Sequence, residues 1–262
     1  MGRASADAGL IDRRFHVPGL DGQAEAFALD AEAAKHVRVL RLSEGAEVEL
    51  FDGRGGKRPA RLEKRAGALW ALATGALVQT PRTQALHLVL CLPKGGKLDD
   101  IVRACGELGV AAVHPALSER SVPRPKGANR LDRVARIAVG AARQSEQPWV
   151  TEVHPSRALA EVLADAPPGA VRLALTERGG DPLAVASGTP EVWVVVGPEG
   201  GLGPADRELL GASGFASVGL GRAILRVETA AVVGVSLVLD RMGLLAPEPA
   251  PHITPDGDAA NR

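Results

Sequence analysis

Residues 85–242 alternate between short segments that are almost wholly apolar and longer segments with helical periodicity. The apolar segments are ALHLVLCLP, AAVHPAL, VRLALTE, EVWVVVG and ASVGLG. Strands that are apolar on both sides belong to sheets covered on both faces, and strands that alternate with helices form parallel sheets. This part of the chain is therefore predicted to have an α/β fold, with helices on both faces of a parallel sheet. The helices are predicted at 97–110, 129–146, 156–166, 206–213 and 228–242.

The first eighty or so residues have a different pattern, which is typical of short antiparallel strands. Residues 46–50 alternate apolar and polar side chains, and Asp52-Gly53 follows them as a tight turn. One helix lies between the strands, and Asp30 is its predicted N-cap. This part of the chain is predicted to be a small β-barrel with one helix.

The two patterns meet in residues 74–84, which have no clear periodicity and contain Pro81, so we expect a linker there. The predicted organisation is a β-barrel domain at residues 1–78 and an α/β domain at residues 79–246. A polar, proline-rich tail at residues 247–262 is expected to be disordered.

The bulk composition excludes several classes of protein. With 262 residues, 45% of them hydrophobic, the chain can bury the core of one large domain or two smaller ones. It has no run of about 18 apolar residues that would span a bilayer, and residues 1–20 lack the apolar stretch of a signal peptide. We therefore expect a cytoplasmic protein without a membrane partner. Cys91 and Cys105 have no metal-ligand spacing, so we expect no metal.

The formal net charge is zero, so a nucleic-acid partner has to be inferred from a local basic patch. One such patch runs from residue 120 to residue 143 and contains a single acidic residue, Asp132. Its basic residues are Arg120, Arg124, Lys126, Arg130, Arg133, Arg136 and Arg143, which gives 7 − 1 = +6. The same pattern is also typical of a solvated helix face.

Three loops follow apolar strands of the predicted sheet: LTERGG, GPEGG and LGRAILRVETA. Ligands of open α/β sheets bind at the carboxyl ends of strands, and successive glycines let a ligand lie against bare backbone. Gly197–Gly201 is neither a Gly-x-Gly-x-x-Gly fingerprint nor a phosphate-binding loop, because no Lys-Ser or Lys-Thr pair follows it. PKGGKLDD at residues 93–100 fails the same test. By themselves, these loops fit either a ligand site or a structural turn.

Taken together, the motifs are more specific. VVVGPEGGLGPAD, LGRAILRVETAA and KLDDIVRACGELGVAAVHPALSERS, with HVRVLR upstream, resemble in order and spacing the RsmE family of ribosomal RNA uridine methyltransferases. The resemblance extends from about Arg14 to about Met242. It implies a SPOUT-type fold: a C-terminal trefoil-knotted parallel sheet with an S-adenosylmethionine (SAM) site, an N-terminal PUA-like RNA-binding β-barrel, and a homodimer. Only the resemblance implies the knot, because threaded chains are otherwise essentially absent from proteins.

The activity implied by the resemblance is SAM-dependent methylation of N3 of a uridine in small-subunit (16S) ribosomal RNA. Two alternatives stay open. One is a SPOUT methyltransferase with another RNA target, and the other is a non-catalytic RNA-binding or ribosome-assembly protein of the same fold. The intact GPEGG and ILRVETA strings favour catalysis.

The implied cofactor-binding residues are those that match the family's three cofactor loops, the first of them more loosely than the others. They are Leu175, Thr176 and Glu177 in the first loop, Val196, Gly197, Pro198, Glu199, Gly200 and Gly201 in the second, and Leu220, Gly221, Ile224, Leu225, Arg226, Glu228, Thr229 and Ala230 in the third.

Arg226 and Glu199 are the candidate catalytic residues. A uracil N3 carries a proton and is a poor nucleophile until that proton leaves, so the site must stabilise a negative imide. Arg226 is a candidate for stabilising this charge or clamping a phosphate, and its alternative role is to hold its own loop. Glu199 either bonds backbone amides or faces the substrate, and loss of the N3 proton to water is left open. Glu228 stands at a helix start, where a carboxylate complements the helix dipole.

RNA contact is the second requirement, because a base inside a stem must be exposed before its N3 can be reached. The predicted RNA-binding residues are Arg14, Arg38, Arg41, Arg120 and Arg124. Arg41 and Arg120 lie in the family-like strings VLR and SERS.

The chain also departs from the family pattern. Arg222-Ala223 stands where the family has Pro-Arg, Val227 replaces a threonine, Gln147 replaces an arginine, and Gly203-Pro204 replaces a serine N-cap. Proline is tolerated in the first turn of a helix, so the last change is expected to be harmless. The changes at Arg222 and Gln147 bear on substrate contact more than on cofactor binding.

Overall fold

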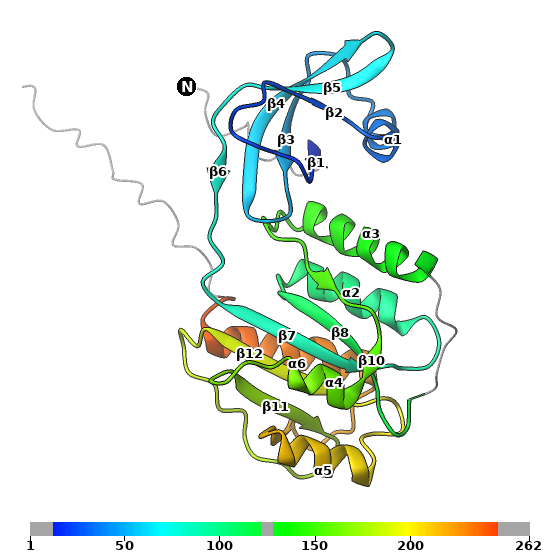
Figure 1. The fold of residues 1–262 in the computed structure, drawn as a ribbon, viewed down its shortest axis with the longest axis vertical. Coiled ribbons are helices and arrows are strands. Elements are labelled where there is room, and N and C mark those ends of the chain that lie inside the picture. The colour runs from blue at the N-terminus through cyan, green and yellow to red at the C-terminus, as the bar shows by residue number, and fades with distance from the viewer. Residues whose placement is uncertain (1–12, 122–127, 246–262) are drawn as a thin grey trace, which may run out of the picture.

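The N-terminal part of the chain forms a six-stranded sheet with the order β1-β3-β4-β5-β2, in which β6 also pairs with β4 (Figure 1). The computed structural model describes residues 13–121 and 128–245. The strands are β1 (Arg14–His16), β2 (Ala26–Ala28), β3 (Glu47–Phe51), β4 (Gly56–Arg65), β5 (Ala68–Ala73) and β6 (Val78–Gln79). Only β1 and β3 pair in parallel, and the edge strands β1 and β2 do not meet in this described sheet. The predicted barrel is thus a curled, mixed half-barrel.

Local side-chain bonds fix the turn and the helix of this half-barrel as predicted. The N-cap of α1 (Ala31–Val39) is Asp30, whose Oδ1 accepts a hydrogen bond of 2.7 Å from the N–H of Ala33. The turn between β3 and β4 forms around Asp52, whose Oδ1 accepts from the N–H groups of Arg54 at 2.6 Å and Gly56 at 2.8 Å. Both features were predicted from the sequence and are confirmed.

The C-terminal sheet has the order β10-β8-β7-β12-β11-β13, with β9 beside β8, and every pair is parallel. Its strands are β7 (Ala85–Cys91), β8 (Ala112–Leu117), β9 (Glu152–Val153), β10 (Arg157–Ala158), β11 (Val171–Thr176), β12 (Glu191–Val196) and β13 (Ala216–Gly219). The predicted parallel sheet is confirmed. The short strands β9 and β10 lacked an apolar run and were not predicted.

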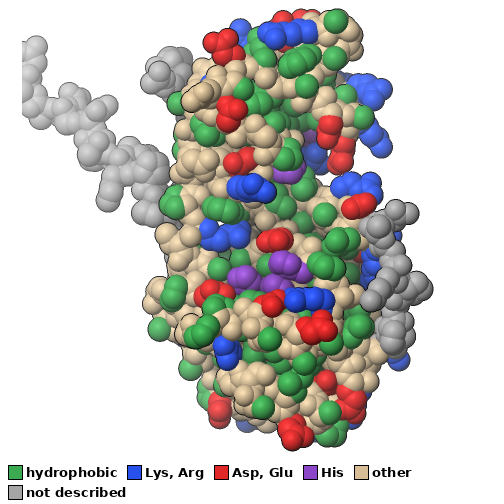
Figure 2. All heavy atoms as spheres, viewed as in Figure 1, with side chains coloured by type: hydrophobic (Ala, Val, Ile, Leu, Met, Phe, Trp, Pro, Cys, Tyr) green, Lys and Arg blue, Asp and Glu red, His purple; other side chains and the backbone are tan. Residues whose placement is uncertain are grey.

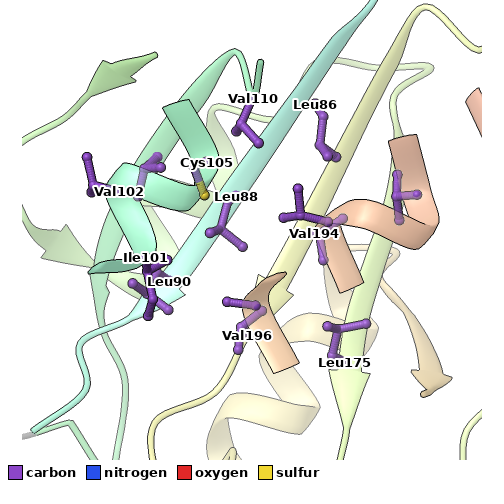
Figure 3. Packing of buried hydrophobic residues seen from close by; sticks show 14 of the residues in the cluster. Leu86, Leu88, Leu90, Ile101, Val102, Cys105, Val110, Leu175, Val194 and Val196 are labelled. Carbon is purple, nitrogen blue, oxygen red and sulfur yellow. The ribbon is translucent and has the colours of Figure 1, made fainter. Parts of the chain in front are cut away.

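Helices cover both faces of this sheet. They are α2 (Lys97–Glu107), α3 (Ala128–Gln144), α4 (Leu159–Ala164), α5 (Pro204–Ala212) and α6 (Val227–Met242). Leu88 and Val194 pack against α2, α3 and α6 on one face, and part of that cluster is drawn in Figure 3. Val89 and Val195 pack against α4 and α5 on the other face. Because neighbouring residues of a strand point to opposite faces, burial on both sides explains why the strands are apolar throughout.

The two sheets are joined by backbone hydrogen bonds as well as by the chain itself. The tip of the β3–β4 hairpin lies beside the segment that follows α3 (Figure 1). The N–H of Gly55 donates to the carbonyl of Pro148, and the N–H of Val150 donates to the carbonyl of Gly53, both at 3.0 Å. The predicted boundary between residues 78 and 79 falls inside β6, and we propose that residues 80–84 form the junction between the domains.

Arg14 was predicted to contact RNA, and its position contradicts this prediction. The residue is only 2% exposed. Its Nε lies 2.6 Å from Oε1 of Glu49, its Nη1 donates to the carbonyl of Ala142 at 3.1 Å, and its guanidinium covers the ring of Phe51. Burial without these partners would be too costly for a cation. Arg14 is therefore a structural residue that joins the half-barrel to α3.

We expect Arg14→Ala to lower the free energy of unfolding by about 2–4 kcal/mol, because Glu49 and the Ala142 carbonyl lose their partner. Chemical denaturation followed by circular dichroism measures this change. Arg61→Ala is the matched control, since Arg61 is exposed on β4 and its loss should change stability by less than about 0.5 kcal/mol. Equal effects of the two substitutions would contradict the structural role of Arg14.

Histidine side chains gather over the C-terminal sheet on the face seen in Figure 2. The His114 ring stacks on His154 and on Trp193, with centroids 4.3 Å and 4.6 Å apart, and its Nε2 lies 3.0 Å from Nδ1 of His87. One of these two nitrogens must lack a proton to accept the hydrogen bond. Burial, followed by the neighbouring charges of His154 and His87, lowers the pKa of His114 to about 3.

The lowered pKa of His114 predicts a loss of stability in acid. Between pH 6.5 and about pH 3 the unfolded chain binds a proton at this residue and the folded protein does not. Stability therefore falls as the pH decreases through this window, by at most about 1.4 kcal/mol per pH unit from this group. Unfolding free energies measured from pH 7 to pH 4 should show a shallower slope for His114→Phe than for the unsubstituted protein. Identical slopes would exclude His114 as the source.

No helix in the described parts of the chain is long and apolar enough to cross a membrane. Within residues 13–121 and 128–245, no group of three or more His, Cys, Asp or Glu side chains is arranged to hold a metal ion. Two sequence predictions concern residues outside the described ranges: RNA contact by Arg124 and the disordered tail at 247–262.

Candidate cofactor pocket

A cavity of about 330 Å³ lies where the loops after β11, β12 and β13 meet. These strands are neighbours in the sheet and run in parallel, so their carboxyl ends lie at one edge. Most of the residues predicted to bind the cofactor line this cavity: Leu175, Thr176, Glu177, Val196, Gly197, Pro198, Gly200, Gly201, Leu220, Gly221, Leu225 and Ala230. Three loops that are far apart in the sequence thus form one pocket, as predicted from their place after the strands.

Five of the predicted cofactor residues do not line the cavity: Glu199, Ile224, Arg226, Glu228 and Thr229. The carboxylates of Glu199 and Glu228 instead pair with Lys97, while Ile224, Arg226 and Thr229 are exposed. A side chain next to a lining residue in a loop can point away from the cavity, and a motif match does not reveal its direction.

Several residues that line the cavity were not predicted to bind a cofactor: Arg120, Arg178, Leu202, Arg207, Ala223 and Val227. Arg178, Ala223 and Val227 belong to loop strings that the sequence already singled out, so those strings contained the signal. Arg207 lies on α5 and had no such signal.

The glycines of the central loop differ in how much space their neighbours leave for a side chain. A Cβ on Gly201 would lie 2.5 Å from Oε1 of Glu177, and Gly201 has φ +67°, in the left-handed region. A Cβ on Gly197 would lie 3.1–3.2 Å from atoms of Leu202. A Cβ on Gly200 would make only ordinary contacts with the flexible side chain of Arg120, at 3.4 Å or more. The shape of the pocket therefore depends more on Gly201 than on Gly200.

Gly201→Ala should weaken ligand binding in this pocket by about tenfold or more, because left-handed backbone is strained for alanine and Glu177 must move. The measurement is isothermal titration calorimetry with SAM as the probe. Gly200→Ala is the matched control, with an expected change of less than about threefold. Stronger loss in the control than in Gly201→Ala would contradict the geometry described for the loop.

The replacement of the serine N-cap before α5 is compensated by a carboxylate from another loop. Oε2 of Glu119 accepts from the N–H of Ala205 at 3.2 Å, and Oδ2 of Asp206 accepts from the N–H of Gly203 at 2.9 Å. A Cβ on Gly203 would collide with the Glu119 carboxylate. Pro204 is the first residue of the helix, where it needs no N–H partner. The change is therefore compatible with a capped helix, as predicted.

Arg120, predicted to contact RNA, lies in the wall of the same cavity. Its Nη1 donates to the carbonyl of Gly200, so the guanidinium borders the central glycine loop while the residue stays exposed.

The other predicted basic residues within the described ranges do not line the cavity. In the basic patch, Arg133 pairs with Asp99, which neutralises part of that patch. Arg38 and Arg41 lie at the end of α1 and just beyond it, and both are exposed.

Lys97 lies between two carboxylates that belong to different cofactor loops. Its Nζ is 2.9 Å from Oε1 of Glu199 and 3.0 Å from Oε2 of Glu228. The N–H of Lys94 also donates to both carboxylate oxygens of Glu199, at 3.0 Å and 3.1 Å. Lys97 was not predicted to take part in the site, although PKGGKLDD had been singled out as a motif.

These contacts shift the pKa values of both carboxyl groups. Burial raises the pKa of Glu199, but the N–H of Lys94 and the ammonium of Lys97 outweigh this effect, and the pKa lies below its ordinary value. A hydrogen bond from its own backbone N–H, followed by Lys97, lowers the pKa of Glu228. Glu199 and then Glu228 raise the pKa of Lys97. All three groups are therefore ionised at neutral pH.

Models of two known protein families match the two parts of the chain. The model of the RNA methyltransferase domain matches residues 80–239, and that of the RNA methyltransferase PUA domain matches residues 29–67. The fold and the site thus define a two-domain RNA methyltransferase of the SPOUT type. The chain is 34% identical to ribosomal RNA small subunit methyltransferase E of Synechocystis sp., over 77% of this chain and 68% of that protein. The chain belongs to the ribosomal RNA small subunit methyltransferase E (RsmE) family.

This chain also aligns with nearly the whole length of further relatives. The enzyme of the same name from Bacillus subtilis is 30% identical, over 85% of this chain and 93% of that protein. The crystal structure of ribosomal RNA small subunit methyltransferase E from Neisseria gonorrhoeae bound to SAM is 27% identical, with a TM-score of 0.80 over 87% of this chain and 97% of that one. A structure from Legionella pneumophila in complex with SAM is 25% identical, with a TM-score of 0.78 and the same coverage.

Proposed function

We propose that this chain is a SAM-dependent methyltransferase that modifies N3 of a uridine in 16S ribosomal RNA. The main support is the cavity formed by the three loops that match the family's cofactor loops. The names of the relatives support ribosomal RNA as the substrate, and two similar structures hold SAM. The position of the methyl group on the base rests on the family resemblance of the loop motifs.

The residues of the pocket fit this cofactor. A cavity of about 330 Å³ is within the size range of small-molecule sites. Gly197 and Gly201 leave bare backbone in its wall, and Leu175, Leu220 and Leu225 provide apolar surface. When bound, the cofactor supplies an electrophilic methyl group on a sulfonium.

The task left to the protein is to favour the deprotonated imide of the base. Arg226 is the N-cap of α6, is exposed, and lies outside the cavity wall, where its guanidinium is available to a substrate. The first turn of a helix adds partial positive charge at the same place. We therefore assign to Arg226 the stabilisation of the negative charge that N3 develops.

Glu199 was a candidate catalytic residue, and its contacts favour a different role. Its carboxylate is bonded to the N–H of Lys94 and paired with Lys97, and its pKa is lowered. A carboxylate with a lowered pKa is a weak base. In this proposal Glu199 holds its loop, and the N3 proton leaves to solvent.

The proposal extends to partners and location. Arg38, Arg41 and Arg120 are the described residues that we assign to RNA contact, since all three are exposed. A homodimer is proposed from the superfamily, and the exposed side chains of Leu237, Leu244 and Leu245 provide apolar surface on α6 and just after it. We also propose that the protein acts in the cytoplasm, where ribosomal subunits are its substrate.

The decisive experiment is transfer of labelled methyl from SAM to small ribosomal subunits that lack their native methylation, followed by nucleoside analysis. We expect 3-methyluridine in 16S ribosomal RNA. Arg226→Ala should reduce the rate of transfer by about 10²-fold or more while SAM affinity changes less than about threefold, because the lost charge acts on the substrate. Arg103→Ala, on the exposed side of α2, is the control that should keep the rate.

Other outcomes would replace the proposal. Label in a different nucleoside or a different RNA would establish a methyltransferase with another target. Cofactor binding without transfer to any RNA would favour the non-catalytic protein of the same fold. Equal loss of transfer rate and of SAM affinity in Arg226→Ala would make Arg226 a residue that only holds its loop.

A further inference from the structure

We infer that Lys97 is a positioning residue that holds the central cofactor loop, Gly197–Gly201, against the first turn of α6. The inference rests on the proposed function, because it concerns the walls of the same cofactor pocket. It gives a role to the PKGGK motif at residues 93–97, which matches no nucleotide-binding pattern.

The first support is geometric. Lys97 is the first residue of α2, and its Nζ lies within 3.0 Å of carboxylates from two other segments, Glu199 after β12 and Glu228 in α6. The side chains of these three residues are 28–32% exposed, so the cluster is half-buried. Ion pairs that are partly shielded from water are stronger than pairs on an open surface.

The second support is the connection between the cluster and the pocket. Glu199 stands between Pro198 and Gly200, and both of these residues line the cavity. Glu228 follows Val227, which also lines it. A shift of either carboxylate therefore moves a residue of the cavity wall that is one peptide bond away.

The third support is the balance of charge. Without Lys97, two carboxylates from separate segments would face each other across the gap that Nζ now fills. Arg226 is the other cation that acts on Glu228, and its side chain is exposed. The backbone N–H of Lys94 would still hold Glu199 to the β7–α2 loop. However, the attraction that links the central cofactor loop, through Glu199, to Glu228 of α6 would become a repulsion.

The test compares SAM affinity, measured by calorimetry, in Lys97→Ala, Lys97→Ala/Glu228→Gln and the unsubstituted protein. We expect Lys97→Ala to weaken SAM binding by about tenfold or more, and Glu228→Gln to restore most of the loss by removing the repulsion. Lys35→Ala, which removes the same charge from α1 in the other domain, should leave SAM affinity unchanged. Circular dichroism and melting temperature establish that each variant is folded.

Two further measurements separate positioning from a general loss of structure. The loss of SAM affinity in Lys97→Ala relative to the unsubstituted protein should become smaller as the pH falls from 7 to 5, because protonation of one carboxyl group removes the repulsion. Hydrogen exchange without cofactor should be faster at Gly197–Gly201 in Lys97→Ala than in the unsubstituted protein, and Glu228→Gln should slow it again.

Clear outcomes would overturn the inference. These are unchanged SAM affinity and unchanged loop exchange in Lys97→Ala, or a loss that Glu228→Gln does not reverse. Failure of the proposed function is distinguishable, since it appears as absent methyl transfer by the unsubstituted protein. In that case hydrogen exchange, which needs neither SAM nor RNA, still decides whether Lys97 holds the loop.

Discussion

The parallel pairing of β11 with β12 on one side and β13 on the other is the constraint on which the pocket depends. Ala174 lies between Val195 and Ser217 in this register, so the three strands end at one edge of the sheet. The pairing is stable because helices bury both faces, α2, α3 and α6 on one and α4 and α5 on the other. Three loops from separate parts of the chain therefore meet at this edge.

Charged side chains then fix the positions of these loops relative to one another. Lys97 connects the loop after β12 with the start of α6, and Glu119 connects the loop after β8 with the start of α5. Arg120, next to Glu119, reaches the carbonyl of Gly200. Glycine-rich loops have high conformational entropy, and contacts from neighbouring segments reduce the number of conformations that a ligand must select. The backbone of the pocket is thus bare enough for close approach and is still held in place.

The N-terminal half-barrel is attached firmly to the methyltransferase domain. Two backbone hydrogen bonds join the β3–β4 hairpin to the segment after α3, and Arg14 bonds the carbonyl of Ala142 from inside the interface. An RNA bound along α1 would therefore have a defined orientation toward the pocket. This arrangement also explains why Arg14 is buried whereas Arg38 and Arg41 are exposed: the guanidinium of Arg14 links the domains.

The sequence by itself determined the alternation of long apolar strands with helices, the Asp30 cap and the loops that form the pocket, because periodicity, capping and turn chemistry act over a few residues. The short strands β9 and β10 left no such signal. The family motifs further predicted which loops line the pocket and which cofactor to test there. Tertiary structure decided which side chains line the cavity and which are held by distant partners. The two bonds of Arg14 reach residues 35 and 128 positions away, and Lys97 meets two carboxylates more than a hundred residues further along the chain. Burial of a charge depends on partners that are distant in sequence, and local patterns do not contain their positions.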